Sequence, residues 1–251
     1  MKKTILITND DGMFAPGIQY LHSFIKDMGE IFIVAPDTGM SGMGHAVTIK
    51  TPLRINELPD LDGAKRYTTN GTPVDCVKLA ISQILKKKPD VIVSGINHGS
   101  NHSVNVLYSG TMAAAIEGAM HNIPSIGFSM CNHDDSIDLS FMKEYVRKIC
   151  QVVFENGLPS GVCLNVNFPN TQNPVGMKVC TQSMGLWDGE FDSRLDVRNQ
   201  HYYWLKGELK VDNSSDKSDG AALKNGFISI VPTTIDLTAF NAMSKLEKLI
   251  L

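Results

Sequence analysis

The sequence has neither a strong excess of charge nor a long apolar run, and these two absences exclude several classes of protein. Its 251 residues carry 23 Lys and Arg against 26 Asp and Glu, which gives a formal net charge of −3. This near balance argues against a protein that coats nucleic acid or a membrane surface, although it is compatible with small phosphorylated ligands. The apolar run behind Met1-Lys2-Lys3 is only four residues long and ends on acids. Such a run is too short for a signal peptide or a membrane span.

Paired cysteines are also lacking. The chain has five cysteines, an odd number with no Cys-x-x-Cys spacing: Cys76, Cys131, Cys150, Cys163 and Cys180. Such a set predicts buried free thiols in a reducing compartment, and not a disulfide framework or a zinc cage. Together with the charge balance and the short apolar run, this set leads us to expect a cytoplasmic, soluble protein with neither a nucleic-acid polymer nor a membrane as a partner.

What the sequence does contain is a regular alternation of short apolar runs and helical patterns. The runs that predict strands lie at residues 4–8, 31–35, 91–94, 125–129 and 162–167. Apolar residues at helical spacing predict helices that begin at Pro16 and lie over residues 77–85, 111–121 and 139–153. Strands that are apolar throughout and alternate with helices indicate a mostly parallel sheet covered on both faces, and hence an α/β fold.

The pattern changes after about residue 170. Residues 171–225 hold both tryptophans, the Tyr202-Tyr203-Trp204 cluster and several polar turns, which indicates hairpins or an extended arm. The aromatic cluster is compatible with ordinary hairpin packing or with a subunit interface, where aromatic residues are enriched. A returning strand at 227–231 and a terminal helix over 234–251 complete the expected order of elements.

Two adjacent carboxylates follow the first predicted strand. Residues 5–12 read Ile-Leu-Ile-Thr-Asn-Asp-Asp-Gly, so the apolar stretch is followed by Asp10 and Asp11. Gly12 then lets the backbone turn. In α/β proteins, ligands bind at the carboxyl ends of parallel strands. Adjacent acids repel each other unless a cation compensates them, and carboxylate oxygens suit Mg²⁺, Mn²⁺ or Ca²⁺. A metal site and a turn whose acids cap the next helix are both compatible with this run.

Polar loops follow other predicted strands. By themselves, Ser41-Gly42 is typical of a turn and Gly71-Thr72-Pro73 of a capped helix start. Residues 94–101, Ser-Gly-Ile-Asn-His-Gly-Ser-Asn, have glycines that allow a ligand to approach the backbone closely. Tyr108-Ser109-Gly110-Thr111 opens the Ala-rich helix, where free N–H groups, hydroxyls and the helix dipole suit either a phosphate site or a simple cap.

A zinc site at His98 and His102 is disfavoured by the residues between them. The two histidines are four apart, but the intervening Gly-Ser-Asn argues against a helix that would place both on one face. No Gly-x-Ser-x-Gly elbow, Walker A loop or Gly-x-Gly-x-x-Gly fingerprint occurs either.

Taken in order, these segments resemble the SurE family, the survival-protein 5′-nucleotidases. The resemblance is carried by Ile-Thr-Asn-Asp-Asp-Gly, Val-Ala-Pro-Asp followed by Ser-Gly, Gly-Thr-Pro-x-Asp-Cys, Ser-Gly-Ile-Asn-x-Gly-x-Asn and Tyr-Ser-Gly-Thr. It covers residues 1–170 and resumes weakly at Ser218-Asp219 and at 226–230. It implies a single domain over residues 1–251, with a core at 1–170, a hairpin arm at 171–225, and a strand and helix at 226–251. The implied fold is a Rossmann-like three-layer αβα sandwich with a C-terminal β-hairpin and helix arm for oligomerisation.

The resemblance also implies a chemistry. The family consists of metal-dependent phosphatases that hydrolyse nucleoside monophosphates, and its metal ligands correspond here to Asp10, Asp11, Ser41 and Asn97. One Mg²⁺ or Mn²⁺ per subunit would activate a water for attack on phosphorus, with Asp10 and Asp11 as the catalytic residues and no general base assigned. The candidate phosphate-binding residues are Asn9, Gly42, Asn101, Ser109, Gly110 and Thr111. The expected product pair is nucleoside and phosphate, with 3′-nucleotides and short polyphosphate as further substrates to test.

Other functions stay open at this point. An aspartyl-phosphate hydrolase would need an Asp-x-Asp pair instead of adjacent acids, and a metal-dependent deacetylase would need histidine ligands. A non-catalytic nucleotide-sensing module would keep the ligands without turnover. The assembly implied by the resemblance is a homodimer or homotetramer.

Two departures from the family pattern bear on substrate preference. After Asn101 the family usually has glycine and then aspartate, where this chain has Ser103 and Asn105. An Arg-rich stretch after Ala-Pro-Asp is replaced by Thr38-Gly39-Met40, which removes positive charge near the site. Both changes leave the four implied metal ligands intact.

Overall fold

The computed structural model describes residues 2–212 and 214–250. Its first part runs β1 (Thr4–Thr8), α1 (Pro16–Ile25), β2 (Glu30–Pro36), β3 (Ile55–Leu61), β4 (Ala64–Thr69), α2 (Pro73–Leu79), β5 (Val91–His98), α3 (Gly110–Met120), β6 (Ser125–Met130), α4 (Lys143–Asn156) and β7 (Val162–Phe168). Its second part runs β8 (Gly176–Val179), β9 (Gly185–Asp188), β10 (Phe191–Leu195), β11 (His201–Leu205), β12 (Glu208–Val211), α5 (Asp219–Lys224), β13 (Phe227–Thr234) and α6 (Phe240–Ile250). A π-helical turn, η1 (Ala80–Ile84), and two 3₁₀ turns, η2 (Ser103–Leu107) and η3 (Ser140–Met142), complete it.

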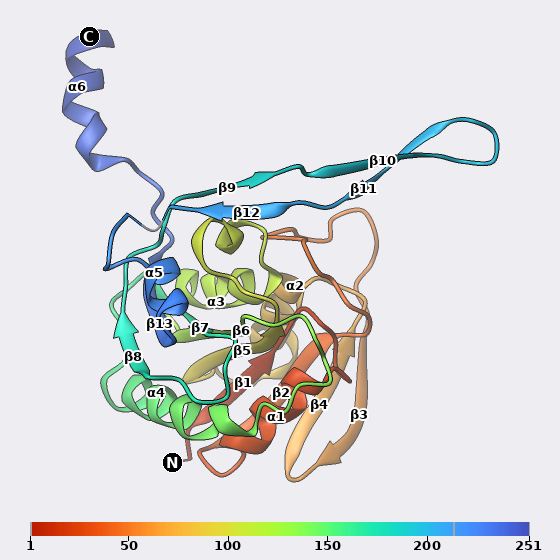
Figure 1. The fold of residues 1–251 in the computed structure, drawn as a ribbon. Helices are drawn as coiled ribbons and strands as arrows, with labels where there is room; N and C mark the ends of the chain where they lie inside the picture. The colour runs from red at the N-terminus through yellow and green to blue at the C-terminus, as the bar shows by residue number, and fades with distance from the viewer. Residues whose placement is uncertain (1, 213, 251) are drawn as a thin grey trace.

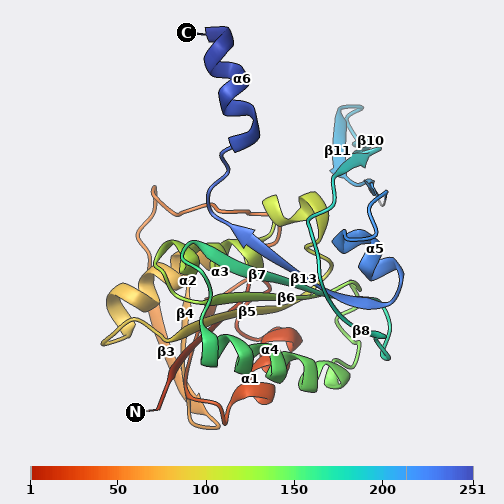
Figure 2. The same ribbon diagram turned by 90° about the vertical axis from the view of Figure 1, so that its left-hand side faces the viewer.

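A nine-stranded sheet in the order β3-β4-β2-β1-β5-β6-β7-β13-β8 forms the middle layer. The six strands from β4 to β7 are parallel, whereas β3 and β13 run antiparallel to their neighbours β4 and β7. Helices α1 and α4 cover one face and α2 and α3 the other, as Figures 1 and 2 show. The three layers confirm the predicted α/β fold with a mostly parallel sheet.

The central strands are apolar throughout because both of their faces are covered. In β1, Ile5 and Ile7 pack into the core under α1 and α4, while Leu6 packs into the core under α2 and α3. All three side chains are fully buried. The layered core therefore fixes where β1 ends, and with it the position of the residues that follow.

The hairpin of β3 and β4 was not predicted, although the sequence contains its signal. Its turn is Asp62-Gly63, with φ of +49° and +81°, and Asp-Gly is a favoured pair for a two-residue hairpin turn. The flanking strands lack the long apolar run that identified the central strands, because β3 is an edge strand and mostly exposed.

Two boundaries of the second part differ from the prediction. Within 171–225, β8 joins the central sheet and α5 forms a helix, so only β9–β12 make the extended antiparallel ribbon of residues 185–211 seen in Figure 1. The terminal helix was expected from residue 234 but begins at Phe240. Thr234 Oγ1 accepts from the N–H of Asp236, and Asp236 Oδ1 accepts from the N–H of Thr238, so local side-chain bonds replace a first helical turn. The predicted final residue, Leu251, lies outside the described residues.

Helix α6 projects from the body of the molecule (Figures 1 and 2), and none of its residues is buried. In the part of the chain that the structure describes, no helix has the length and apolarity needed to cross a membrane.

Candidate active site

The acids lie in a tight loop directly after β1, and Asn9 closes that loop. Its Nδ2 donates to the carbonyl of Gly12 at 2.9 Å, and its Oδ1 accepts from the N–H of Gly12 at 3.2 Å. Gly12 has φ of +100°, a conformation that favours glycine. Asn9, predicted to bind phosphate, thus has both amide atoms engaged within the loop and is fully buried.

Asp10 lies against the N-terminus of α3. The hydroxyl and the backbone N–H of Thr111 both bond to its carboxylate. A Cβ added to Gly110 would lie 2.7 Å from Asp10 Cβ, so only glycine allows this approach. Ser109 caps the helix by accepting from the N–H of Met112 at 3.0 Å. The helix N-terminus stabilises an anion, and Gly110 and Thr111, predicted to bind phosphate, support Asp10 in this structure.

The pair of acids has hydrogen-bond donors nearby, but burial outweighs them. Burial and repulsion from Asp11 raise the pKa of Asp10 to about 6, and burial raises the pKa of Asp11 as well. Asp11 Oδ2 is buried and makes no hydrogen bond. Neither acid has a Lys, Arg or His partner within 4.0 Å among the described residues. A cation at this point would offset the cost of burying both charges.

Asn97 lies at an irregularity near the end of β5 and lines the same cleft as Asp10. The register with β6 shifts between Ser94 and Asn97. Asn97 Nδ2 donates to the carbonyl of Gly99 at 2.7 Å, which fixes the amide and leaves its oxygen outside that bond. The backbone N–H of His98 also bonds to Asp11, which connects the loop after β1 to the end of β5.

The loop that carries Ser41 is held from both sides. The N–H of Met40 donates to the carbonyl of Asp10 at 2.7 Å, and the N–H of Gly44 donates to the carbonyl of Tyr108 at 3.0 Å. His45 then contacts the buried carboxylate of Glu117 on α3 at 3.0 Å. Burial acts to raise the pKa of Glu117, but hydrogen bonds from His45 and Lys78 outweigh it and lower this pKa to about 2. The Ser41 loop is therefore anchored to β1 and to α3.

These segments enclose a cleft of about 700 Å³. Its lining includes six of the ten predicted site residues: Asp10, Ser41, Gly42, Asn97, Asn101 and Ser109. The other four, which are Asn9, Asp11, Gly110 and Thr111, do not line the cleft. Four segments that are far apart in the sequence thus meet at one end of the sheet, as the carboxyl ends of parallel strands do.

The four predicted metal ligands all offer oxygen donors, and the cleft lining also includes the imidazoles of His98 and His133. Two carboxylates, the hydroxyl of Ser41 and the amide oxygen of Asn97 are the ligand types that hard divalent cations take. Within residues 2–212 and 214–250, no group of three or more His, Cys, Asp or Glu residues is placed to hold a metal. By the chemistry of their oxygen donors, the four predicted ligands fit Mg²⁺ or Mn²⁺.

A buried polar network behind the cleft was not predicted. Asn101 donates from Nδ2 to Ser129 Oγ and from its backbone N–H to Asn167 Oδ1, each at 2.8 Å. Asn165 Nδ2 donates to the carbonyl of Asn101, and Asn167 Nδ2 donates to Asn165 Oδ1. Buried amides with satisfied bonds hold the 99–101 loop in place. The sequence did contain a signal for this network, because asparagines occupy the alternate positions 165 and 167 of the otherwise apolar β7.

Ser103 and Asn105, which depart from the family pattern, both make contacts with the second part of the chain. Ser103 has φ of +56°, a position that favours glycine; its N–H donates to Asp219 at 2.9 Å and its hydroxyl to the carbonyl of Ser183 at 3.1 Å. Asn105 accepts from Trp187 Nε1 at 3.0 Å and donates to the carbonyl of Ser100 at 3.2 Å. Both residues therefore connect η2 to the second part of the chain.

The ribbon supplies part of the cleft that sequence reasoning missed. Trp187, Glu190, Leu205, Lys206 and Gly207 all line it. These residues are some 80 to 110 positions away from η2 in the sequence. No local pattern connects them to the cleft, and only the path of the ribbon brings them there.

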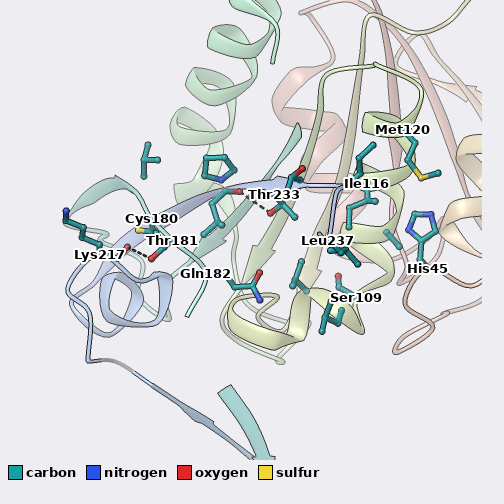
Figure 3. Close-up of a pocket in the computed structure, with 18 residues that line it drawn as sticks. His45, Ser109, Ile116, Met120, Cys180, Thr181, Gln182, Lys217, Thr233 and Leu237 are labelled. Carbon is teal, nitrogen blue, oxygen red and sulfur yellow. Dashed lines mark hydrogen bonds between the residues drawn. The ribbon is translucent and has the colours of Figure 1, made fainter. Parts of the chain in front are cut away.

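A larger cavity of about 1010 Å³ lies between α3, β8 and β13. Figure 3 shows Ile116 and Met120 of α3 and Leu237 around it. Its lining, taken over the described residues, contains no Asp or Glu. Because the described lining of this mostly apolar cavity offers no carboxylate, whereas the smaller cleft is lined by Asp10, we take the cleft as the candidate catalytic site.

Comparison with known proteins gives a consistent picture. The family model described as "Survival protein SurE" matches residues 5–189. A protein of Flavobacterium psychrophilum named 5′-nucleotidase SurE is 46% identical over 98% of this chain and 97% of the relative. A protein of Bacteroides fragilis with the same name is 46% identical over 97% of this chain and 96% of the relative.

A solved structure agrees with the fold as well. The crystal structure of the SurE protein from Aquifex aeolicus superposes with a TM-score of 0.84 at 36% sequence identity. The match covers 98% of this chain and 99% of that protein. The layered core and the second part of the chain are therefore both included in the similarity.

Proposed function

Because this chain belongs to the SurE family, we propose that it is a 5′-nucleotidase that hydrolyses nucleoside 5′-monophosphates to nucleoside and phosphate. The observation that carries the proposal is the adjacent pair of the buried Asp10 and the half-buried Asp11 at the end of β1. Asp11 Oδ2 has no hydrogen-bond partner among the described residues, and Asp10 lines one cleft together with Ser41 and Asn97. A buried pair of like charges is costly unless a cation is bound.

The proposed metal ligands are Asp10, Asp11, Ser41 and Asn97, and the proposed cofactor is one Mg²⁺ or Mn²⁺ per subunit. When bound, such a cation withdraws charge from a phosphate oxygen and lowers the pKa of a coordinated water. Thr111 holds the carboxylate of Asp10 by its hydroxyl and N–H, and Gly99 holds the amide of Asn97. These bonds orient the ligand oxygens in advance.

The phosphate is proposed to lie between the metal ligands and the start of α3. Ser109, Gly42 and Asn101 line the cleft there and offer a hydroxyl, a backbone N–H in an open glycine loop, and a side-chain amide. The dipole of α3 favours the negative charge of the transferring group at the same place. In phosphoryl transfer, such positioning and charge stabilisation are the main tasks of the protein.

Phosphate release from a panel of substrates tests the proposal. We expect release from 5′-nucleotides to stop with EDTA and to return with Mn²⁺ or Mg²⁺, because the donor set consists of hard oxygen ligands. The panel includes 3′-nucleotides, short polyphosphate and an aryl phosphate. Zn²⁺ serves as the metal comparison. Release that persists through exhaustive chelation would contradict metal dependence, and nucleotide binding without release under any metal would indicate the sensing module.

We also propose that the chain forms a homodimer or homotetramer through its second part. On α6, the exposed side chains Phe240, Met243, Leu246 and Ile250 recur at helical spacing and form one apolar face. A projecting helix of 11 residues with no buried side chain is too short to be stable by itself, so a partner surface is expected to cover this face.

The double variant Met243→Glu with Leu246→Glu should lower the molar mass in solution, measured by light scattering after size exclusion. Charge on the apolar face opposes its burial in an interface. The matched control is Asn241→Glu with Ser244→Glu, which adds equal charge to the polar face of α6. An unchanged mass for the first variant would show that α6 does not hold the assembly together.

A further inference from the structure

The ribbon forms part of the wall of the cleft near η2. The start of β9 packs tightly there, since a Cβ added to Gly185 would lie 2.6 Å from Ser103 Oγ. The hydroxyl of Ser103 donates to the carbonyl of Ser183, just before β9. The start of the ribbon is therefore fixed to η2, the turn that follows Asn97 and residues 99–101.

Trp187 is held at this wall by specific contacts. Its Nε1–H donates to Asn105 Oδ1 at 3.0 Å, and Asn105 is itself held by its bond to the carbonyl of Ser100. A Cβ added to Gly207 would lie 3.3 Å from Trp187 Cε3, so this glycine lets β12 pass close to the ring. The indole is half-buried and lines the cleft. Its polar atom is satisfied, so the part that remains available to a ligand is the apolar ring.

The cleft is much larger than a phosphate group needs. Its volume of about 700 Å³ lies within the range of sites for small organic ligands. Acidic and polar residues, among them Asp10, Ser41 and Asn97, form the end assigned to the cation and the phosphate. Trp187, Leu205 and the half-exposed Tyr108 supply aromatic and aliphatic lining, beside Glu190 and Lys206 of the ribbon. A nucleotide has the same division, with a charged phosphate and a flat, weakly polar base.

We propose that Trp187 is the stacking platform for the nucleobase and that Asn105 is the positioning residue that holds its ring. This inference rests on the proposed function, because it assigns the part of the nucleotide that the metal ligands do not touch. Every nucleobase has a π face, and stacking on an aromatic side chain tolerates any base. The enzyme should therefore accept both purine and pyrimidine nucleotides and should disfavour phosphate esters that lack a base.

Kinetics on substrates with and without a base test the platform. Trp187→Ala should lower kcat/KM for AMP roughly ten- to a hundredfold, mainly through KM, because base stacking is lost. Hydrolysis of ribose 5-phosphate should change by less than about twofold, since that substrate makes no stacking contact. Asn105→Leu should also lower kcat/KM for AMP, by a smaller factor than Trp187→Ala. Trp204→Ala, at the exposed second tryptophan on β11, is the matched control and should leave kcat/KM unchanged for both substrates.

Fluorescence gives a readout that does not depend on turnover. Trp187 and Trp204 are the two tryptophans of the chain, so each variant with one of them replaced by Phe reports on the other. With Mg²⁺ and the methylenephosphonate analogue of AMP, whose P–C bond is not hydrolysed, Trp204→Phe should show saturable quenching. Trp187→Phe should show none, and ribose 5-phosphate should quench neither variant.

The outcomes separate this inference from the proposed function. An equal loss of kcat/KM for AMP and ribose 5-phosphate in Trp187→Ala would overturn the platform and leave only a structural role. Unchanged AMP kinetics, or no quenching of Trp187 by the analogue, would overturn it too. If the wild type released phosphate from neither substrate, the proposed function would fail, while saturable quenching of Trp187 would still support the base site.

Discussion

Asp10→Asn should abolish phosphate release while the protein stays folded. The substitution keeps the shape of the side chain and an oxygen that can accept from Thr111, but it removes the charge that is proposed to bind the cation. Metal ions contribute several kcal/mol to such reactions, so we expect a loss of about a thousandfold or more in kcat/KM. In metal-free buffer the variant should unfold at the same temperature as the wild type or higher, because burial and Asp11 make the ionised Asp10 unfavourable. Substrate assays with Mn²⁺ and thermal unfolding measure the two effects.

Asp60→Asn is the matched control for that experiment. Asp60 is an exposed carboxylate on the edge strand β3, so its loss should leave both activity and stability near the wild-type values. An Asp10→Asn enzyme that keeps activity within tenfold of the wild type would remove Asp10 from the metal site. A covalent phosphoaspartate trapped on the wild-type enzyme would assign Asp10 a nucleophilic role instead.

Asp219→Ala should destabilise the fold more than any other single change considered above. Asp219 is fully buried at the start of α5 and accepts from the N–H groups of Ser103, Ser183 and Gly220 and from the hydroxyl of Ser183. Alanine would leave several buried donors without a partner, at a cost of about 1–3 kcal/mol each. We therefore expect the free energy of unfolding to fall by about 3–5 kcal/mol in denaturant titrations.

Asp216→Ala provides the comparison, because it removes a carboxylate three positions away that is exposed. Its free energy of unfolding should lie within about 0.5 kcal/mol of the wild type. The free energy of unfolding of Asp219→Asn should lie between those of Asp219→Ala and Asp216→Ala, since the asparagine amide keeps one accepting oxygen. Equal midpoints for Asp219→Ala and Asp216→Ala would mean that the bonds of Asp219 do not hold η2, residues 181–183 and α5 together.

The layered core could be predicted from the sequence because its signal is local. A strand buried on both faces must be apolar at consecutive positions, and Ile5, Leu6 and Ile7 show that pattern directly. The cap of α2 is just as local: Thr72 accepts from the N–H of Asp75, and Asp75 bonds back to the N–H of Thr72, as the Thr-Pro-x-Asp spacing indicates. The β3–β4 hairpin was detectable at Asp62-Gly63 and was missed because its strands are largely exposed.

The convergence of the candidate metal-site residues was predictable for a different reason. In a parallel sheet, residues that follow successive strands lie at one edge, so Asp10, Ser41, Asn97 and Ser109 could be expected to converge from their positions after strands and before a helix. Their presence in one cleft agrees with that expectation. The commitment of Thr111 and Asn9 to internal hydrogen bonds was not predictable, because it depends on where Asp10 and Gly12 lie in space.

By itself, the sequence determined the alternation of strands and helices, the apolar central layer and the identity of the acids at the end of β1. Each follows from the chemistry of neighbouring residues. Only the tertiary structure decided that β13 returns antiparallel to β7, that Asp219 joins η2 to α5, and that Trp187 reaches the cleft. These contacts join residues that are far apart in the sequence, and their geometry depends on the packing of the whole chain, which no local pattern encodes.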